Sequence, residues 1–125
     1  MRALFVDDEV EFLELMQKRL SRRKMDIAVA KDGQTALEIL ENSTKEGETP
    51  FQIVVMDVRM PDMDGLETLR RIKAKMPDLP IILLSGHACM DAAVQGLEFG
   101  AFDYMLKPVA ISELLIKMEE AVRSV

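Results

Sequence analysis

The sequence contains a single cysteine, Cys89, and it has no long apolar run and no excess of positive charge. One cysteine excludes an internal disulfide, and none of the apolar runs approaches the ~20 residues that a membrane-spanning helix needs. The N-terminal stretch MRALFVDDEV places three acids directly behind a short apolar run, which is wrong for a secretory signal peptide. We therefore expect a cytoplasmic protein that does not enter a membrane.

The formal net charge of −6 disfavours direct contact with nucleic acid. One segment is nevertheless locally basic, with the residues Lys18, Arg19, Arg22, Arg23 and Lys24. It falls where an early helix should end, and pairing with the helix dipole together with solvation explains it better than a nucleic-acid patch does. Because 49% of the 125 residues are hydrophobic, the chain can bury a core, and we expect residues 1–125 to form one domain.

Short apolar runs alternate with longer stretches of helical spacing. The expected strands are ALFV (3–6), IAVA (27–30), IVVM (53–56), IILL (81–84) and FDYML (102–106). The helical spacing is most regular in the last helix, whose apolar stripe comprises Ile111, Leu114, Leu115, Met118 and Val122. Continuous apolar strands between amphipathic helices predict an α/β class, a doubly wound (βα)5 domain with a five-stranded parallel sheet.

Polar residues follow the expected strands at the edge where an open parallel sheet places its chemistry. They are Asp7, Asp8 and Glu9 after the first strand, Asp57 after the third, Ser85 after the fourth and Lys107 after the fifth. Clustered carboxylates repel one another unless a cation is bound, and oxygen ligands suit Mg2+ or Mn2+ better than zinc. One carboxylate can then serve as a nucleophile, while Lys107 and the Ser85 hydroxyl hold a second anion, for which a phosphoryl group is the best candidate.

The motifs at these strand ends resemble those of the receiver domains of two-component response regulators, in the CheY-like superfamily. The resemblance covers the whole chain and rests on VDDE (6–9), MDVRMPDMDG (56–65), LSGHA (84–88) and GAFDYMLKP (100–108). It implies a flavodoxin-like sheet of strand order 2-1-3-4-5, an order that periodicity alone does not give. It also implies a phosphorylation-dependent signalling switch.

The resemblance assigns the phosphoacceptor and the metal ligands. Asp57 would accept a phosphoryl group from the phosphohistidine of a sensor histidine kinase or a phosphotransfer protein. Asp8, Asp57 and the backbone carbonyl of Arg59 would ligate Mg2+ or Mn2+, and Asp7 would act through a metal-bound water. The domain would assist its own phosphorylation and dephosphorylation without being an enzyme in the usual sense.

The resemblance also assigns the switch. Lys107, joined to Pro108 by a cis peptide bond, would pair with the phosphoryl oxygens. Ser85 would hydrogen-bond the attached group, and Tyr104 would change rotamer with it. The altered face would comprise the fourth helix (within 87–100), the strand at 102–106 and the last helix, and would control an output domain, a partner protein or a homodimer.

Purely structural interpretations of these residues stay open. Asp7 and Asp8 could cap a helix, Ser85 and Lys107 could belong to turns, and Tyr104 could be core packing. His87 and Cys89 lack the further ligands that zinc requires, and we expect His87 to line the phosphorylation site.

Three other functions compete with the signalling switch. A phosphohydrolase of the haloacid-dehalogenase type wants an aspartate two residues after the nucleophile, where this chain has Arg59. A flavin or nucleotide module needs a Gly- or Ser/Thr-rich phosphate loop, where this chain has DDEVE. A receiver-like interaction module that is never phosphorylated is disfavoured because every acidic, hydroxyl and lysine position of the motif is filled.

Overall fold

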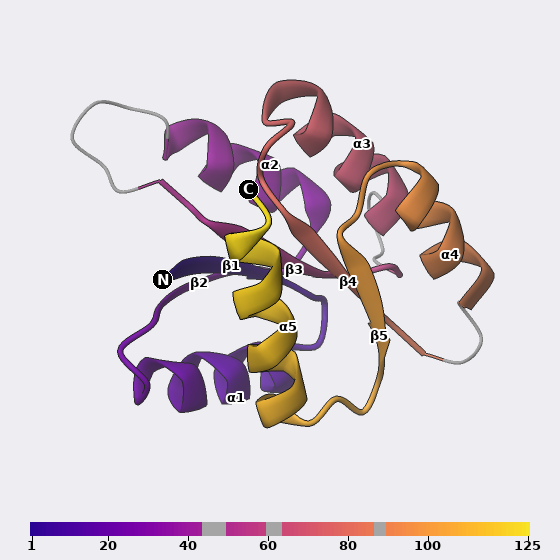
Figure 1. Ribbon diagram of the computed structural model, residues 1–125. Helices are drawn as coiled ribbons and strands as arrows, with labels where there is room; N and C mark the ends of the chain where they lie inside the picture. Colours follow the sequence, from indigo (N-terminus) through magenta and orange to yellow (C-terminus); the bar gives the residue numbers. More distant parts are fainter. Residues whose placement is uncertain (44–49, 60–63, 87–89) are drawn as a thin grey trace.

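The computed structural model describes residues 1–43, 50–59, 64–86 and 90–125, and strands and helices alternate along these ranges (Figure 1). The elements are β1 (Arg2–Val6), α1 (Val10–Ser21), β2 (Asp26–Ala30), α2 (Gly33–Asn42), β3 (Ile53–Asp57), α3 (Gly65–Lys75), β4 (Ile81–Ser85), α4 (Met90–Glu98), β5 (Asp103–Leu106) and α5 (Ile111–Arg123). Every strand end lies within one residue of its predicted position. The expected (βα)5 organisation is therefore confirmed.

The sheet is parallel throughout and has the order β2-β1-β3-β4-β5, which confirms the flavodoxin-like order 2-1-3-4-5. In Figure 1, α1 and α5 cover one face of the sheet, and α2, α3 and α4 cover the other. Asp57 pairs with Leu84, and Ser85 pairs with Leu106. This register brings the carboxyl ends of the central strands to one rim.

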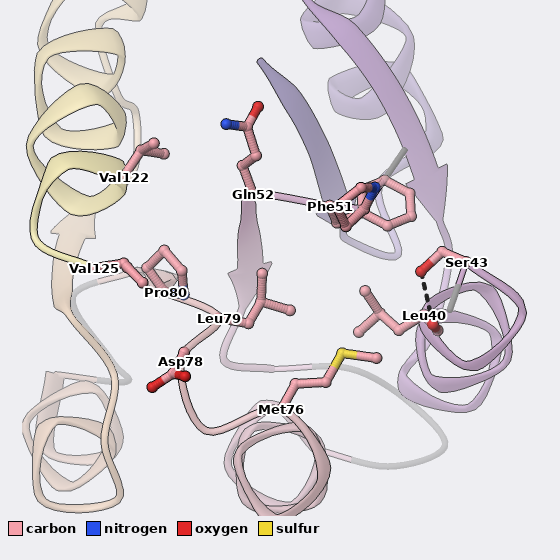
Figure 2. Close-up of a pocket in the computed structure, with 11 residues that line it drawn as sticks. Leu40, Ser43, Phe51, Gln52, Met76, Asp78, Leu79, Pro80, Val122 and Val125 are labelled. Atoms are coloured by element: carbon pink, nitrogen blue, oxygen red, sulfur yellow. Dashed lines mark hydrogen bonds between the residues drawn. The ribbon is translucent and has the colours of Figure 1, made fainter. Parts of the chain in front are cut away.

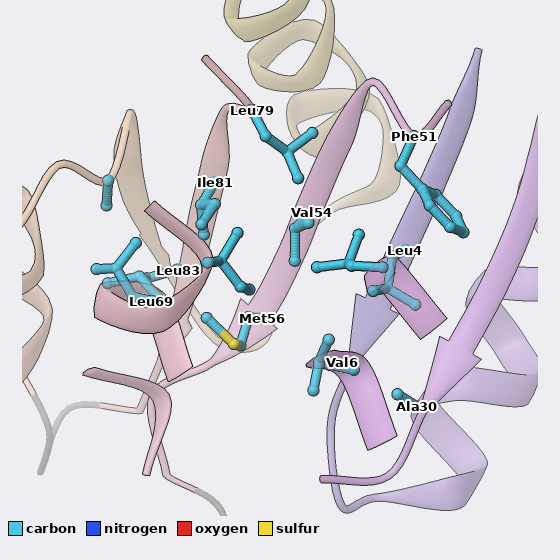
Figure 3. Packing of buried hydrophobic residues seen from close by; sticks show 14 of the residues in the cluster. Leu4, Val6, Ala30, Phe51, Val54, Met56, Leu69, Leu79, Ile81 and Leu83 are labelled. Carbon is cyan, nitrogen blue, oxygen red and sulfur yellow. The ribbon is translucent and has the colours of Figure 1, made fainter. Parts of the chain in front are cut away.

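The two faces of the sheet bury separate apolar clusters because successive strand residues point in opposite directions. On β1, Leu4 and Val6 pack toward α2, α3 and α4, while Ala3 and Phe5 pack toward α1 and α5. Figure 3 shows the first of these clusters, to which Met56 and Leu83 belong. Each fully buried residue of this size contributes about 1.5–3 kcal/mol, so both layers hold the strand ends in place.

Helix ends follow the polar signals in the sequence. The Asp32 carboxylate accepts a hydrogen bond from the backbone N–H of Thr35 (2.7 Å) and so caps α2. Lys18 and Arg19 lie in the last turn of α1, as expected for cations that pair with the helix dipole. No helix in the described part of the chain combines the length and the apolar character that membrane crossing requires.

Gly65 brings the start of α3 into direct contact with the end of β3. Its amide donates a hydrogen bond to the Val58 carbonyl (2.7 Å), and a Cβ at this position would lie 2.5 Å from the Asp57 carbonyl oxygen and 2.7 Å from the Val58 Cα. Backbone atoms cannot swing aside as a side-chain end can. A glycine is therefore required immediately beside Asp57.

We predict that Gly65→Ala lowers the free energy of unfolding by about 1–3 kcal/mol, because the added methyl group overpacks the backbone of β3. Gly86→Ala is the matched control, since no described heavy atom lies within 4 Å of the Cβ that it would add. Urea unfolding of both variants checks the prediction. Equal stability of the two variants would contradict it.

Candidate functional site

Three aspartates meet at the carboxyl rim of the sheet. Asp7 and Asp8 follow β1, and Asp57 ends β3, the neighbouring strand. One carboxylate oxygen from each lies within 4.8 Å of the others. Asp7 is 1% exposed and Asp57 is 8% exposed, whereas Asp8 faces solvent. The sequence prediction that these residues converge is confirmed.

Lys107 joins this cluster from the end of β5. Its Nζ lies 2.6 Å from Asp7 Oδ2, 3.1 Å from Asp57 Oδ2 and 3.3 Å from Glu9 Oε1. Its backbone amide donates to the Ser85 carbonyl (2.9 Å), and its peptide bond to Pro108 is cis, as predicted. One ammonium group thus connects β1, β3 and β5.

Each of the two buried aspartates has one oxygen fixed by the backbone. Asp7 Oδ1 accepts from the Glu9 amide (2.9 Å), and Asp57 Oδ1 accepts from the Arg59 amide (3.0 Å). Such contacts two residues ahead are typical of the aspartate turn. In both residues the second oxygen, Oδ2, is the one that faces Lys107. The carboxylates are therefore held in defined orientations.

Burial and charge act in opposite directions on this cluster. Burial raises the pKa of Asp7, and the hydrogen bond from Lys107 offsets that effect only in part. Burial alone would lower the pKa of Lys107, but the hydrogen bond and charge of Asp7, with the charge of Asp57, raise it well above its ordinary range. Lys107 is therefore a fixed positive charge at the rim.

Ser85 lies beside Lys107 at the rim, whereas Tyr104 lies three residues before Lys107 on β5. The Ser85 side chain is fully buried at the end of β4, and its hydroxyl donates to the Gly86 carbonyl (2.9 Å). Tyr104 lies on β5 opposite Leu83 and is half-buried against the cluster beneath α4. The structure thus brings both residues to the strands that carry the site, while their switch roles stay predictions.

Of the remaining residues in the sequence predictions, Arg59 lies within the part of the chain that the structure describes. Arg59 is exposed, and the role of its carbonyl stays a prediction. The predictions for His87 and Cys89 lie outside the described residues.

Sequence reasoning missed two partners of Lys107. Glu9 contacts its ammonium, and the ring centroid of Phe12 lies 4.7 Å from its Nζ. Phe12 belongs to the apolar stripe of α1, a pattern that predicts packing against the core rather than contact with a charged group. The missed signal was its place in the first turn of α1, directly behind the acidic run.

The set of donors at the rim fits a hard divalent cation. Carboxylate oxygens from the ends of two adjacent strands lie close enough together to bind one ion, within 4.8 Å of one another, and one of the three carboxylates is open to solvent. A hollow of about 540 Å³ lies at the opposite, amino end of the strands (Figure 2). Its lining is mostly apolar and includes Leu40, Phe51, Leu79 and Val122. The polar chemistry of the molecule therefore belongs to the rim.

Comparisons with known proteins identify the family to which this chain belongs. The family model for the response regulator receiver domain matches residues 3–119, and the chain belongs to that family. It is 41% identical over 123 residues to the two-component response regulator ARR10 of Arabidopsis thaliana, covering 98% of this chain and 21% of the relative. It is 37% identical to the response regulator MprA of a Mycobacterium strain, over 98% of this chain and 50% of the relative.

Solved structures give the same result. A response regulator receiver domain protein from Clostridium thermocellum superposes with a TM-score of 0.91 at 28% identity, over 98% of this chain and 94% of that one. The chain spans about a fifth to a half of the curated relatives named above. It is a receiver domain, a signalling domain and not a typical enzyme. Its family and its acidic rim fit a phosphorylation-dependent switch, and the hydrolase and flavin alternatives are not favoured.

We predict that Lys107→Met destabilises the domain by about 1–3 kcal/mol, because two buried carboxylates lose their charged hydrogen-bond donor. Lys117→Met is the matched control. It breaks an ion pair with Asp103 (2.8 Å) at the surface, for which we expect about 1 kcal/mol or less. Urea unfolding compares the two.

A second substitution makes this test specific. Adding Asp57→Asn to Lys107→Met should restore part of the stability, because it removes one of the carboxylates left without a cation. Equal losses in the two lysine variants, or no recovery in the double variant, would contradict the role given to Lys107.

Proposed function

We propose that this domain receives one phosphoryl group on Asp57 from the phosphohistidine of a sensor kinase or a phosphotransfer protein. The observation that carries the proposal is the convergence of Asp7, Asp57 and Lys107, with Lys107 Nζ 3.1 Å from Asp57 Oδ2. A nucleophile and a fixed cation thus share one rim. This arrangement suits transfer of an anionic group.

The chemistry requires little beyond position and charge. A carboxylate oxygen of Asp57 forms the new bond to phosphorus while the bond from phosphorus to the donor breaks, and the leaving group keeps the electron pair. No general base is needed, because the carboxylate carries no proton to remove. Lys107 stabilises the charge on the equatorial phosphoryl oxygens, and the Arg59 amide orients Asp57.

The same carboxylates would hold a divalent cation, Mg2+ or Mn2+. Asp8, Asp57 and the Arg59 carbonyl would be its ligands, with Asp7 acting through water. When bound, the ion neutralises charge on the phosphoryl oxygens and between the carboxylates. Because few protein ligands are offered, we expect millimolar affinity.

We predict that Mg2+ at ten times its dissociation constant stabilises the native domain by about 1.4 kcal/mol and stabilises Asp8→Ala far less. In the presence of a chelator, Asp8→Ala should be at least as stable as the native domain, since it carries one like charge fewer at the rim. Thermal unfolding with and without Mg2+ measures both effects. Glu14→Gln, which changes an exposed acid of α1 outside the cluster, is the control. An Mg2+ response in Asp8→Ala as large as the native one would refute this ligand set.

We predict that acetyl phosphate with Mg2+ adds one phosphoryl group to the native domain and none to Asp57→Ala. Mass spectrometry after borohydride trapping detects the aspartyl phosphate and locates it. Asp32→Ala is the control, because Asp32 caps α2 and does not belong to the carboxylate cluster of Asp7, Asp8 and Asp57. Modification of Asp57→Ala to the native extent would rule out Asp57 as the acceptor.

The output would lie on the face formed by α4, β5 and α5. Backbone contact between Lys107 and Ser85 couples the rim to β5 (2.9 Å), and Tyr104 packs beneath α4. Helix α4 exposes Met90, Val94 and Leu97, the side chains that a partner would cover. Phosphorylation would shift this face between two states and so control an output domain, a partner protein or self-association.

We predict that beryllofluoride, which stands in for the phosphoryl group on Asp57, shifts backbone amide resonances along residues 90–106 and at the start of α5. It should also reduce the number of rotamers that the Tyr104 side chain populates. Asp57→Ala with the same additive provides the control spectrum. Changes confined to the neighbourhood of Asp57 would show that the domain does not signal through this face.

A further inference from the structure

The ring of Phe12 forms one side of the Lys107 site. Its centroid lies 4.7 Å from Lys107 Nζ, within the ~6 Å over which a ring face attracts a cation. Phe12 stands in the first turn of α1, three residues after Glu9, and is half-buried against the cluster of α1 and α5. Two elements far apart in the sequence thus meet at this ammonium.

Among the partners that the described residues offer Lys107, Phe12 is different in kind. Asp7, Asp57 and Glu9 hold the ammonium, but each also cancels its positive charge. An uncharged ring attracts the ammonium without neutralising it. The ring therefore leaves the positive potential of Lys107 available to an incoming anion.

We propose that Phe12 is a positioning residue for phosphoryl transfer, a role that rests on the function proposed above. Its ring keeps the Lys107 ammonium at the rim when the carboxylates bind the divalent cation. Lys107 can then pair with the phosphoryl oxygens without a change in its side-chain conformation. Glu9 cannot replace it, because the Glu9 side chain is 65% exposed and brings a negative charge toward an anionic donor.

The simpler role for Phe12 is to fill space. It lines a groove of about 600 Å³ between α1 and the segment after β5, together with Leu15, Val109 and Ile111. Any apolar side chain of similar size would serve that purpose. The two roles differ in one respect, because among uncharged apolar side chains only an aromatic ring attracts a cation.

A series of substitutions at position 12 separates these roles. The rate of acetyl phosphate uptake should fall about two- to fivefold in Phe12→Leu, whereas Phe12→Tyr and Phe12→Trp should keep the native rate or exceed it. Leu15→Ala is the control, because Leu15 lines the same groove but has no ring face that could attract the Lys107 ammonium. Equal loss in the leucine and tyrosine variants would overturn the proposal.

A double-mutant cycle tests whether Phe12 acts through Lys107. We expect the Lys107→Met variant and the Lys107→Met, Phe12→Leu double variant to take up acetyl phosphate at the same rate. A further loss of similar size would show that Phe12 merely supports the fold, and would overturn the proposal.

NMR of the protein without added metal or donor supplies a readout that is independent of activity. The Lys107 ε-methylene protons should lie upfield in the native domain because of the ring current, remain upfield in Phe12→Tyr, and move downfield in Phe12→Leu. Unchanged resonances in Phe12→Leu would overturn the contact. A native domain that takes up no phosphoryl group would refute the proposed function. If the native domain is phosphorylated but the rates of the position-12 variants do not follow the expected order, only the role proposed for Phe12 is refuted.

Discussion

The ammonium of Lys107 is the interaction on which the rest of this site depends. Two of its three carboxylate partners are buried, and burial raises the pKa of Asp7 even with the lysine in place. Without a cation, these carboxylates would repel one another across adjacent strands. Lys107 therefore stabilises an arrangement that is unfavourable for the fold but ready for chemistry. A site of this kind trades stability for function.

The sheet makes this arrangement possible by fixing where each strand ends. Parallel pairing in register brings the ends of β1, β3 and β5 to one rim, and apolar layers on both faces keep the strands from sliding. At the end of β3, Gly65 lets the backbone of α3 approach Asp57 directly. The Asp57 carboxylate, which we propose as the nucleophile, is thus presented by rigid elements rather than by a loose loop. Positions held in this way need little reorganisation during transfer.

Much of this could be predicted from the sequence, for physical reasons. Continuous apolar runs locate buried parallel strands, and strand ends that meet at one edge predict that Asp7, Asp57 and Lys107 converge. The strand order came from family resemblance, because pairing between distant segments leaves no periodic signal. The place of Phe12 directly behind the acidic run signals only that it lies near the rim, since its contact with Lys107 also depends on how the half-buried ring is oriented in the first turn of α1. The same limit applies to the hydroxyl of Ser85, which donates to the neighbouring backbone.

The most direct test of the central role of Lys107 is its own titration. We would follow the Lys107 side-chain carbon and proton resonances by NMR as the pH is raised past about 10.4, the ordinary pKa of a lysine. Because Asp7 and Asp57 hold the pKa of Lys107 above that value, its ammonium should stay charged after the surface lysines have lost their protons. Replacing either aspartate with asparagine should bring the titration of Lys107 to lower pH. A Lys107 that titrates together with the surface lysines, or that ignores both substitutions, would contradict the account.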